Sequence, residues 1–533
     1  MFSETLLLVL LLLFAVFLLT MLAQKLKISY PIFLVIAGLG ISFIPGIPRI
    51  AIEPEMVFLI FLPPLLYESA WYTSWNDFWK WRSPIVMLAF GLVFFTSIIV
   101  AFVSTAMIPG FSLAMGFLLG GIISPPDAVA ANSVLKHIKI PKRLTTVLEG
   151  ESLINDASSL IVFRFALAAI LSGQFSMQQA IGQFFLAAGM GVVIGLAIAH
   201  IVYVVHRFLP TTPSIDTALT LMSPYFMYIG AEHFHYSGVM AVVSGGLFLS
   251  YRSHEILSHS ASRIQAISVW ATLAFVLNGL VFILIGLELP IIMESLGDYS
   301  ITQAIHYGLI ISITIIVIRL LYTLLLAYLP SWFGHTKQAD PKNPQWKGAV
   351  ILGWAGMRGV VSLASALSIP LLLSNGQAFP HRSLILFITF IVILITLVFQ
   401  GLSLPSIIKW TGIKDIEDFP PEAEQEAGIR LRLMQASLKH LNAHFAAELE
   451  ENELIQFLKK QLESDISITD QQLASLECDT TEKVEIAQYN SVLMDIYSVQ
   501  RRELYQLRKE KMFSDEQIRK QENQLDLDEA RLI

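Results

Sequence analysis

The segment Gly150-Glu151-Ser152-Leu153-Ile154-Asn155-Asp156 places two carboxylates inside an apolar stretch long enough to cross a lipid bilayer. A carboxylate at the centre of a membrane helix costs about 2.5–3.5 kcal/mol, so it is kept where it faces a cavity, a partner charge or a transported ion. In a helix, Glu151 and Asn155 are i,i+4 neighbours, as are Ser152 and Asp156, so all four share one broad face. Their oxygens are hard ligands, which suit a small monovalent cation better than an apolar substrate.

Composition indicates an integral membrane protein with a separate tail. The 533 residues are 55% hydrophobic and 14% charged, against roughly 25% charged in soluble proteins. Residues 1–410 hold 20 basic and 16 acidic side chains, whereas residues 411–533 hold 15 and 26. We therefore predict a membrane domain over 1–410 and an acidic tail over 411–533. The apolar run over 5–21 lacks a positively charged start, which favours a first membrane helix over a signal peptide.

Apolar runs of about 17–30 residues suit membrane-spanning helices, and thirteen runs are found, the second and ninth of them short. We expect an all-α polytopic protein of about thirteen transmembrane helices. In the tail, residues 431–462 and 483–523 carry apolar residues at helical spacing, which predicts a helical tail for assembly or regulation. The thirteen runs are 4–24, 30–44, 54–74, 83–107, 111–135, 143–172, 180–209, 214–234, 237–251, 268–290, 304–330, 346–373 and 383–410.

Basic residues in the connections predict the orientation. Alternate connections between the predicted helices lie on the same side of the membrane, and the connections on one side together contain fourteen basic residues. The connections on the opposite side contain only Arg49 and Arg382. Because cytoplasmic loops are rich in Lys and Arg, the N-terminus is predicted outside and the tail in the cytoplasm of a multi-pass plasma (inner) membrane protein. The fourteen are Lys25, Lys27, Lys80, Arg82, Lys136, Lys139, Lys142, Arg143, Arg207, Arg252, Arg263, Lys337, Lys342 and Lys347.

Two of the predicted helices contain helix-breaking residues. The fifth contains Ser124-Pro125-Pro126-Asp127, whose prolines remove two backbone donors, and the twelfth contains Gly353-Trp354-Ala355-Gly356-Met357-Arg358-Gly359. An opened backbone at membrane depth is tolerated where it lines a cavity or is buried in protein. A pair of broken helices in corresponding places indicates the binding site of a secondary transporter. The two broken helices are seven positions apart in the order of predicted helices. This offset predicts two inverted repeats, formed by predicted helices 1 to 6 and 8 to 13, in which the broken helices cross.

The broken ends carry partial charges that need compensation. If the two helices cross, Asp127 is expected to neutralise the two N-terminal ends and Arg358 the two C-terminal ends. Asp127 can also reach a cation, directly or through water. Glu151 needs a counter-charge to stay ionised, and Arg319 in the eleventh helix is the first choice, with Arg358 the second.

Other polar residues in the apolar runs receive weaker assignments. Arg164 lies two turns beyond Asp156, where either snorkelling or gating fits. The stretch Asn278–Glu288 is a candidate for lining the cavity, and Glu68 and Glu232 are expected at helix ends facing water. The twelve histidines are scattered without the spacing of a metal site, so we expect no cofactor beyond transported Na⁺ and H⁺.

Taken together, these motifs resemble the monovalent cation/proton antiporter family 1, of the NhaP and sodium/proton exchanger type. The resemblance spans most of residues 1–410 and does not cover the tail. It is carried, in chain order, by Phe61–Glu68, Ser124–Ala130, Gly150–Asp156, Asn278–Leu289, Gly356–Gly359 and Gln400–Leu402.

The resemblance implies a homodimer of thirteen-helix subunits, each with a dimerisation domain and a six-helix core. It implies that Asp156 binds cation and proton alternately and that Asn155 is its neutral companion. Asp127 and Ser152 are implied to help bind the transported Na⁺.

Two further positions are informative by the same resemblance. Glu151 is implied to pair with Arg319, in agreement with the first choice above. Many members have a threonine before the aspartate of the fifth helix, whereas this chain has Pro126, which offers only its carbonyl oxygen to the cation.

These residues predict 1:1, electroneutral exchange of Na⁺, or of Li⁺ or K⁺, for H⁺, with a role in pH homeostasis. Asp156 would be deprotonated to bind the cation and protonated to return, and Asn155 leaves one titratable site for the cycle. A gated monovalent cation channel is the alternative. A third hypothesis is an intramembrane aspartyl protease that uses Asp127 and Asp156. Neither aspartate lies in the Tyr-Asp or Gly-x-Gly-Asp sequence expected of such an enzyme. The protein is therefore expected to be a transporter and no enzyme.

Overall fold

The computed structural model describes residues 2–44, 57–136, 138, 140–172, 177–257, 259–294, 296, 299–332, 345–373, 376–413, 422–477, 482–510 and 515–529. Four of the basic loop residues used for the orientation, Arg49, Lys139, Lys337 and Lys342, lie outside these ranges. The chain forms two compact units, Met1–Asp415 and Ile416–Ile533. Each is described by itself.

The first unit is built from helices, and its described residues add only one isolated bridge, between Leu372 and Ala378. Helical elements in the first half are α1 (Phe2–Leu26), α2 (Tyr30–Ser42), η1 (Val57–Phe61), α4 (Leu62–Tyr72), α5 (Trp75–Lys80), α6 (Arg82–Val86), η2 (Met87–Leu92), α7 (Val93–Met107), α8 (Leu113–Ile123), α9 (Ala128–Leu135) and α10 (Lys142–Ser172). In the second half they are α11 (Met177–Phe208), α12 (Pro213–His233), α13 (Gly238–Tyr251), α14 (Ser253–Ile256), α15 (Ser260–Leu287), α16 (Leu289–Glu294), α17 (Ile301–Trp332), α18 (Gln345–Trp354), α19 (Val360–Leu367), α20 (Arg382–Leu394), η3 (Ile395–Gln400) and α21 (Gly401–Thr411).

The all-α membrane architecture agrees with the prediction. Every one of the thirteen predicted runs overlaps a described helical segment, and the fifth and twelfth runs are each divided into two helices, α8–α9 and α18–α19. Among the described residues, eight helices are long and apolar enough to cross a membrane, and two shorter apolar helices are α2 and α13. The count of thirteen crossings and the inverted repeats stay predictions.

Small residues bring α7 and α8 into backbone contact. A Cβ added at Gly116 would lie 2.6 Å from Cα of Ala101, and one added at Gly120 would lie 2.7 Å from Cα of Ser97. Such close approach through small residues is a common way to pack helices in a bilayer, where apolar side chains gain little by leaving lipid. Helix α8 ends at Ile123, one residue before the Ser124-Pro125-Pro126-Asp127 segment.

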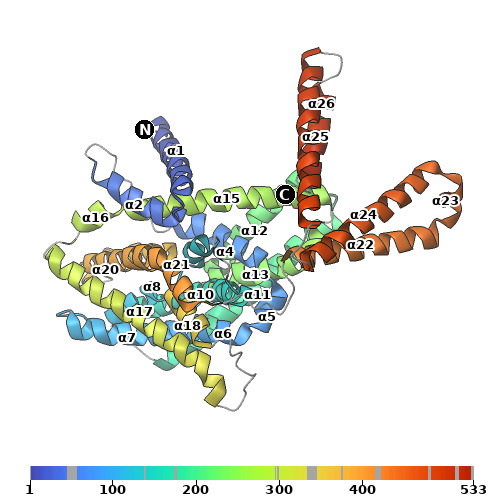
Figure 1. Cartoon of the computed structure of the whole chain (residues 1–533). Helices are drawn as coiled ribbons and strands as arrows, with labels where there is room; N and C mark the ends of the chain where they lie inside the picture. Colours follow the sequence, from blue (N-terminus) through green and yellow to red (C-terminus); the bar gives the residue numbers. More distant parts are fainter. Residues whose placement is uncertain are drawn as a thin grey trace. The chain divides into compact units, whose positions relative to one another are not determined.

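Helix α10 lies in the middle of the first unit, whereas α1 stands at its edge (Figure 1). Helix α10 packs against α8, η2, α6 and α13, and it is the helix that contains Ser152 to Asp156. Long stretches of α1 and α11 expose apolar side chains, as expected of surfaces that face lipid or another subunit. A helix that packs against several others in the middle of the unit therefore carries the candidate site.

The second unit consists of helical hairpins. Helices α22 (Glu422–His444), α23 (Ala446–Glu451) and α24 (Glu453–Glu477) form one, and α25 (Glu482–Glu510) and α26 (Asp515–Glu529) form another (Figure 1). Arg501 of α25 contacts Asp526 at 2.6 Å and also Glu529, both of α26. The described residues of the two predicted helical runs lie within these hairpins, and the role of the hairpins in assembly or regulation stays a prediction.

Candidate functional site

Two helix interruptions meet in the first unit. Helix α8 ends at Ile123 and α9 begins at Ala128, while α18 ends at Trp354 and α19 begins at Val360. The backbone N–H of Asp127, in the first interruption, donates to the carbonyl of Met357, in the second, at 2.7 Å. The two broken helices therefore cross where they are interrupted, which brings four helix ends together.

Asp127 and Arg358 lie at opposite kinds of helix end. The Asp127 carboxylate accepts from the N–H groups of Val129 at 2.8 Å and Ala130 at 3.4 Å, and it also hydrogen-bonds to the backbone of Val360. One carboxylate thus caps the N-termini of both α9 and α19. Because helix N-termini are partially positive, a negative charge is stabilised there.

The buried Arg358 side chain compensates the C-terminal ends. Its guanidinium donates to the carbonyls of Ile123 at 2.9 Å and Ser124 at 3.4 Å, and also to the carbonyl of Gly356. Its backbone N–H donates to Oγ1 of Thr396 at 3.1 Å. These carbonyls belong to the ends of α8 and α18, so the arginine satisfies acceptors that no helix turn can satisfy.

The Asp127 carboxylate leaves no room for a side chain at position 359. A Cβ built on Gly359 would lie 1.8 Å from Oδ2 of Asp127. We expect Gly359→Ala to displace Asp127 from the crossover, to lower thermal stability by about 1–3 kcal/mol through overpacking, and to slow transport. Melting in detergent and exchange in proteoliposomes measure the two effects. Gly40→Ala is the control, because nothing lies within 4 Å of a Cβ there; equal behaviour of the two variants would contradict the prediction.

Helix α10 is attached to the first interruption through two successive turns. Oγ of Ser152 accepts from the N–H of Ala128 at 3.2 Å, and Nδ2 of Asn155 donates to the carbonyl of Pro126 at 3.2 Å. Ser152, Asn155 and Pro126 are therefore brought together, as the sequence predicts. The carbonyl that Pro126 offers is already a hydrogen-bond acceptor in this structure.

Two neighbouring oxygen-bearing groups on α10 have unused hydrogen-bonding capacity. Asp156 is 8% exposed, and its carboxylate accepts no hydrogen bond from the residues that the structure describes, although the charge of Asp127 is close enough to act on it. Asn155 is fully buried, and its Oδ1 also has no hydrogen-bond partner within the described part of the chain. Because buried polar atoms are nearly always satisfied, these oxygens are the best candidates for holding a cation or a proton.

Glu151 points away from this group. Its carboxylate forms a two-point ion pair with the guanidinium of Arg319, at 2.5 and 2.8 Å, and the two side chains are 1% and 0% exposed. Nε of Arg319 donates to the carbonyl of Leu352 at 3.2 Å. The pair therefore joins α10 to α17 and to α18, and Arg358, the second choice of partner, serves the crossover instead.

Arg164 receives a partner that the sequence did not assign. Its guanidinium donates to both carboxylate oxygens of Glu232 at 2.8 Å, which joins α10 to the end of α12. The side chains are 45% and 28% exposed, so Glu232 faces water only in part. An ion pair this exposed contributes about 0–1 kcal/mol to stability.

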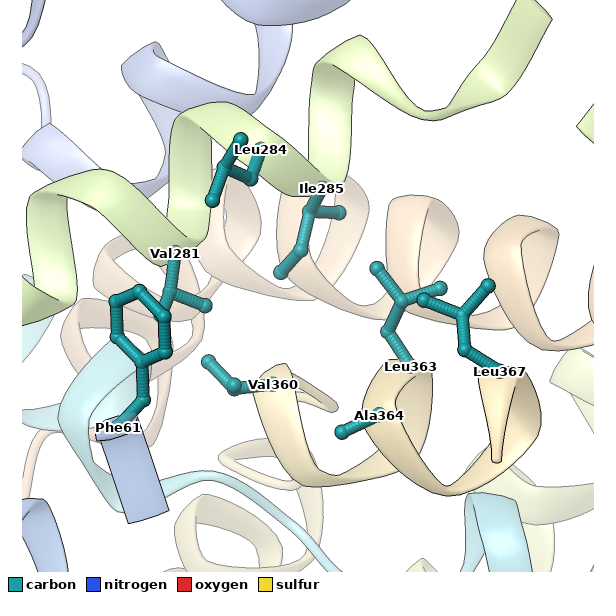
Figure 2. Close-up of a pocket in the computed structure, with 8 residues that line it drawn as sticks. All are labelled: Phe61, Val281, Leu284, Ile285, Val360, Leu363, Ala364 and Leu367. Carbon is teal, nitrogen blue, oxygen red and sulfur yellow. The ribbon is translucent and has the colours of Figure 1, made fainter. Parts of the chain in front are cut away.

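The predicted lining stretch of the tenth helix borders an apolar pocket. Figure 2 shows the pocket between α15 and α19, lined by Phe61, Val281, Leu284, Ile285, Val360, Leu363, Ala364 and Leu367. Its lining side chains offer no cation ligand. Asn278 and Glu288 are both buried, at 7% and 2% exposure.

A buried polar group at one end of α11 was missed by the sequence reasoning. Nδ1 of His206 lies 3.1 Å from Oδ1 of Asp216, and Oγ of Ser262 donates to Oδ2 of Asp216 at 2.7 Å. The three side chains are almost completely buried and join α11, α12 and α15. The available signal was Asp216 itself, an acid inside the predicted run 214–234.

Comparisons with known proteins agree with this architecture. Residues 10–410 match the family model "Sodium/hydrogen exchanger, transmembrane". The chain is 34% identical over 388 residues to a sodium, potassium, lithium and rubidium/H⁺ antiporter of Bacillus pumilus, with 70% of this chain and 57% of that protein covered. The chain thus spans little more than half the length of that relative.

Two more similarities extend the comparison. An uncharacterized Na⁺/H⁺ exchanger of Mycobacterium tuberculosis is 30% identical over 525 residues, covering 96% of this chain and 94% of that protein. The solved structure of the sodium proton antiporter MjNhaP1 from Methanocaldococcus jannaschii superposes with a TM-score of 0.59 at 20% identity, covering 75% of this chain and 96% of that one, which shows the same fold. The match over residues 10–410 shows, in agreement with the crossed helices, that the chain belongs to the transmembrane sodium/hydrogen exchanger family.

Proposed function

We propose that the protein is a secondary antiporter that exchanges a monovalent cation, Na⁺ with Li⁺ or K⁺ as alternatives, for H⁺. The observation that carries the proposal is the Asp156 carboxylate, buried and without a hydrogen-bond donor among the described residues. It lies beside the unpartnered Oδ1 of Asn155 and close to Asp127. The names of the relatives, which include Na⁺, K⁺, Li⁺ and Rb⁺ antiporters, support the same class of substrate.

The mechanism follows from competition for one carboxylate. Deprotonated Asp156 binds the cation together with oxygens of Ser152, Asn155 or the Pro126 carbonyl, and Asp127 adds negative charge nearby. Protonated Asp156 is neutral and has no charge with which to hold a cation. Each of the two ions excludes the other from this carboxylate. The carrier therefore changes between the states open to opposite sides of the membrane with either one cation or one proton bound, and this couples the two fluxes.

This scheme is electroneutral. Asn155 is neutral in both half-cycles, and Glu151 is held by Arg319, so Asp156 is the single exchangeable acid. Each half-cycle then moves one positive charge across the membrane. The net charge transfer per cycle is zero, and no membrane potential is built up or consumed.

The placement of the rest of the chain completes the proposal. The bias of basic loop residues supports an external N-terminus and a cytoplasmic C-terminal tail. The exposed apolar surfaces of α1 and α11 are available for a homodimer contact. The division at Asp415 leaves residues 416–533 as a helical unit for assembly or regulation.

The proposal is tested in proteoliposomes that carry a pH gradient and a pH-sensitive dye. Addition of Na⁺, Li⁺ or K⁺ in turn should dissipate the gradient for each transported cation. The rate should be the same with and without a potential imposed by valinomycin and K⁺, measured with Na⁺ or Li⁺ as the substrate. A steady conductance without proton counterflow would show a channel instead, and a rate that follows the imposed potential would contradict 1:1 exchange.

A further inference from the structure

Two histidines lie one turn apart at the C-terminal end of α22. His440 and His444 are four positions apart on a helix that ends at His444, so their side chains share one face. Their imidazole rings stack with centroids 4.3 Å apart and an angle of 27° between the ring planes. Both side chains are exposed. The structure therefore brings two potential metal ligands into contact in the second unit, a pair that the sequence reasoning missed.

A hydrogen bond to the backbone determines which nitrogen of His444 carries a proton. Nδ1 of His444 lies 3.3 Å from the carbonyl oxygen of His440. Because a carbonyl oxygen can only accept, Nδ1 is the donor, and Nε2 of the neutral ring keeps its lone pair. Histidines that bind metal ions usually donate their other ring N–H to a carbonyl or a carboxylate in this way. The ring of His444 therefore has a nitrogen available for a metal ion.

The distance between the two rings suits a shared ion. Zinc binds imidazole nitrogens at about 2.0–2.1 Å, so two such nitrogens on one tetrahedral ion lie about 3.3 Å apart. Rings with centroids 4.3 Å apart can reach this separation by side-chain rotation alone, and exposed side chains change rotamer readily. Two histidines at the same helical spacing bind zinc in the metalloprotease motif H-E-x-x-H.

The surroundings of the pair favour a cation. The C-terminal end of a helix is partially negative, and α22 ends at His444. Residues 411–533 hold 26 acidic and 15 basic side chains, and an excess of acids attracts cations. Lys439, the adjacent basic residue in the chain, is exposed to solvent.

The number of protein ligands indicates the kind of site. Among the described residues, no third His, Cys, Asp or Glu side chain joins the pair in a metal-binding group, so water would complete the coordination of a bound ion. Structural zinc sites are closed by four protein ligands, whereas a site with open positions exchanges its other ligands. The pair is therefore suited to reversible binding.

We propose that His440 and His444 form a reversible binding site for a divalent transition-metal ion, Zn²⁺ in the first place, on the C-terminal tail. Imidazole nitrogens suit Zn²⁺, Ni²⁺ and Cu²⁺, whereas Mg²⁺ prefers oxygen ligands. The site differs in its ligand chemistry from the oxygen ligands around Asp156. A bound ion would link the two ends of the last turn of α22, directly before the chain leaves the helix at Phe445.

The test measures metal binding and does not depend on transport. Zn²⁺ or Mg²⁺ is titrated into full-length protein in detergent, purified with a tag that contains no histidine, and the heat of binding is recorded. Wild type should have a Zn²⁺ site that His440→Gln/His444→Gln lacks, and Mg²⁺ should not bind to it. Because loss of even a hydrogen-bond partner of a ligand costs about 10–100-fold in metal affinity, His444→Gln alone should weaken binding at least as much.

Amide hydrogen exchange locates the bound ion. Zn²⁺ should slow exchange in the last turn of α22 in wild type and leave it unchanged in the double variant. The matched control is His254→Gln/His306→Gln, which removes two exposed histidines from two different helices, α14 and α17, and it should keep both effects. Zinc binding by His440→Gln/His444→Gln equal to that of wild type, or equal losses in the two double variants, would overturn the proposal.

Discussion

Asp156→Asn should reduce proton-coupled cation exchange to the level of liposomes without protein. The substitution keeps the size of the side chain and removes the one charge that a cation needs at membrane depth, where an unneutralised ion is costly. The amide group of asparagine also does not ionise as a carboxyl group does, so it cannot bind and release the transported proton, and both half-cycles are blocked. The measurement is dissipation of a pH gradient on addition of Na⁺, Li⁺ or K⁺.

The same variant should be as stable as wild type or more stable. The Asp156 carboxylate is buried, and it receives no hydrogen bond from the described residues. Replacing it by a neutral amide therefore removes a desolvation cost without breaking a contact. Asp77→Asn is the matched control, since Asp77 is partly exposed and contacts Lys142, and its exchange rate should stay normal. Wild-type exchange by Asp156→Asn would refute the assignment of this carboxylate.

Glu151→Gln should destabilise the protein by about 3–5 kcal/mol, the usual cost of removing one member of a buried ion pair. The guanidinium of Arg319 would remain 0% exposed without its counter-charge. It would also remain close to Arg358, whose charge acts on it in the same buried region. A marked fall in the melting temperature in detergent is the expected result, together with reduced amounts of folded protein.

The matched control for this prediction is Glu232→Gln. It breaks the ion pair with Arg164, which is partly exposed and should contribute about 0–1 kcal/mol. Replacing Glu151 and Arg319 together by leucine should be less destabilising than removing either charge alone, because no unpaired buried charge is left. Equal melting temperatures for Glu151→Gln and Glu232→Gln would show that the buried ion pair contributes no more to stability than the partly exposed one.

Local sequence patterns predicted the helices and their interruptions well. A run of apolar residues is helical at membrane depth because the backbone has no other way to satisfy its hydrogen bonds. Pro125 and Pro126 remove backbone donors from the fifth helix, and the structure ends α8 and begins α9 around them. The charges of Asp127 and Arg358 lie at the N-terminal and C-terminal helix ends that these interruptions create, as the helix dipole requires.

The same local patterns could not predict which side chains on different helices contact one another. The sequence ranked Arg319 ahead of Arg358 as the partner of Glu151 without showing the contact, and it left Arg164 between two roles. It gave no reason to connect His206 with Asp216 and Ser262. Each of these pairings depends on which helices are neighbours and on the rotation of each helix about its axis, and neither quantity is encoded in the local spacing of residues.

The sequence by itself determined the kind of protein, the interrupted helices and a small set of candidate oxygen ligands around Asp156, because the cost of charge and open backbone in a bilayer leaves few explanations for them. Only the tertiary structure decided which contacts the two acids of the Glu151–Asp156 segment make. Packing of α17 beside α10 gives Glu151 a two-point contact with Arg319. The Asp156 carboxylate, five residues on, is left without a donor among the described residues, because side chains five residues apart project from the helix in different directions.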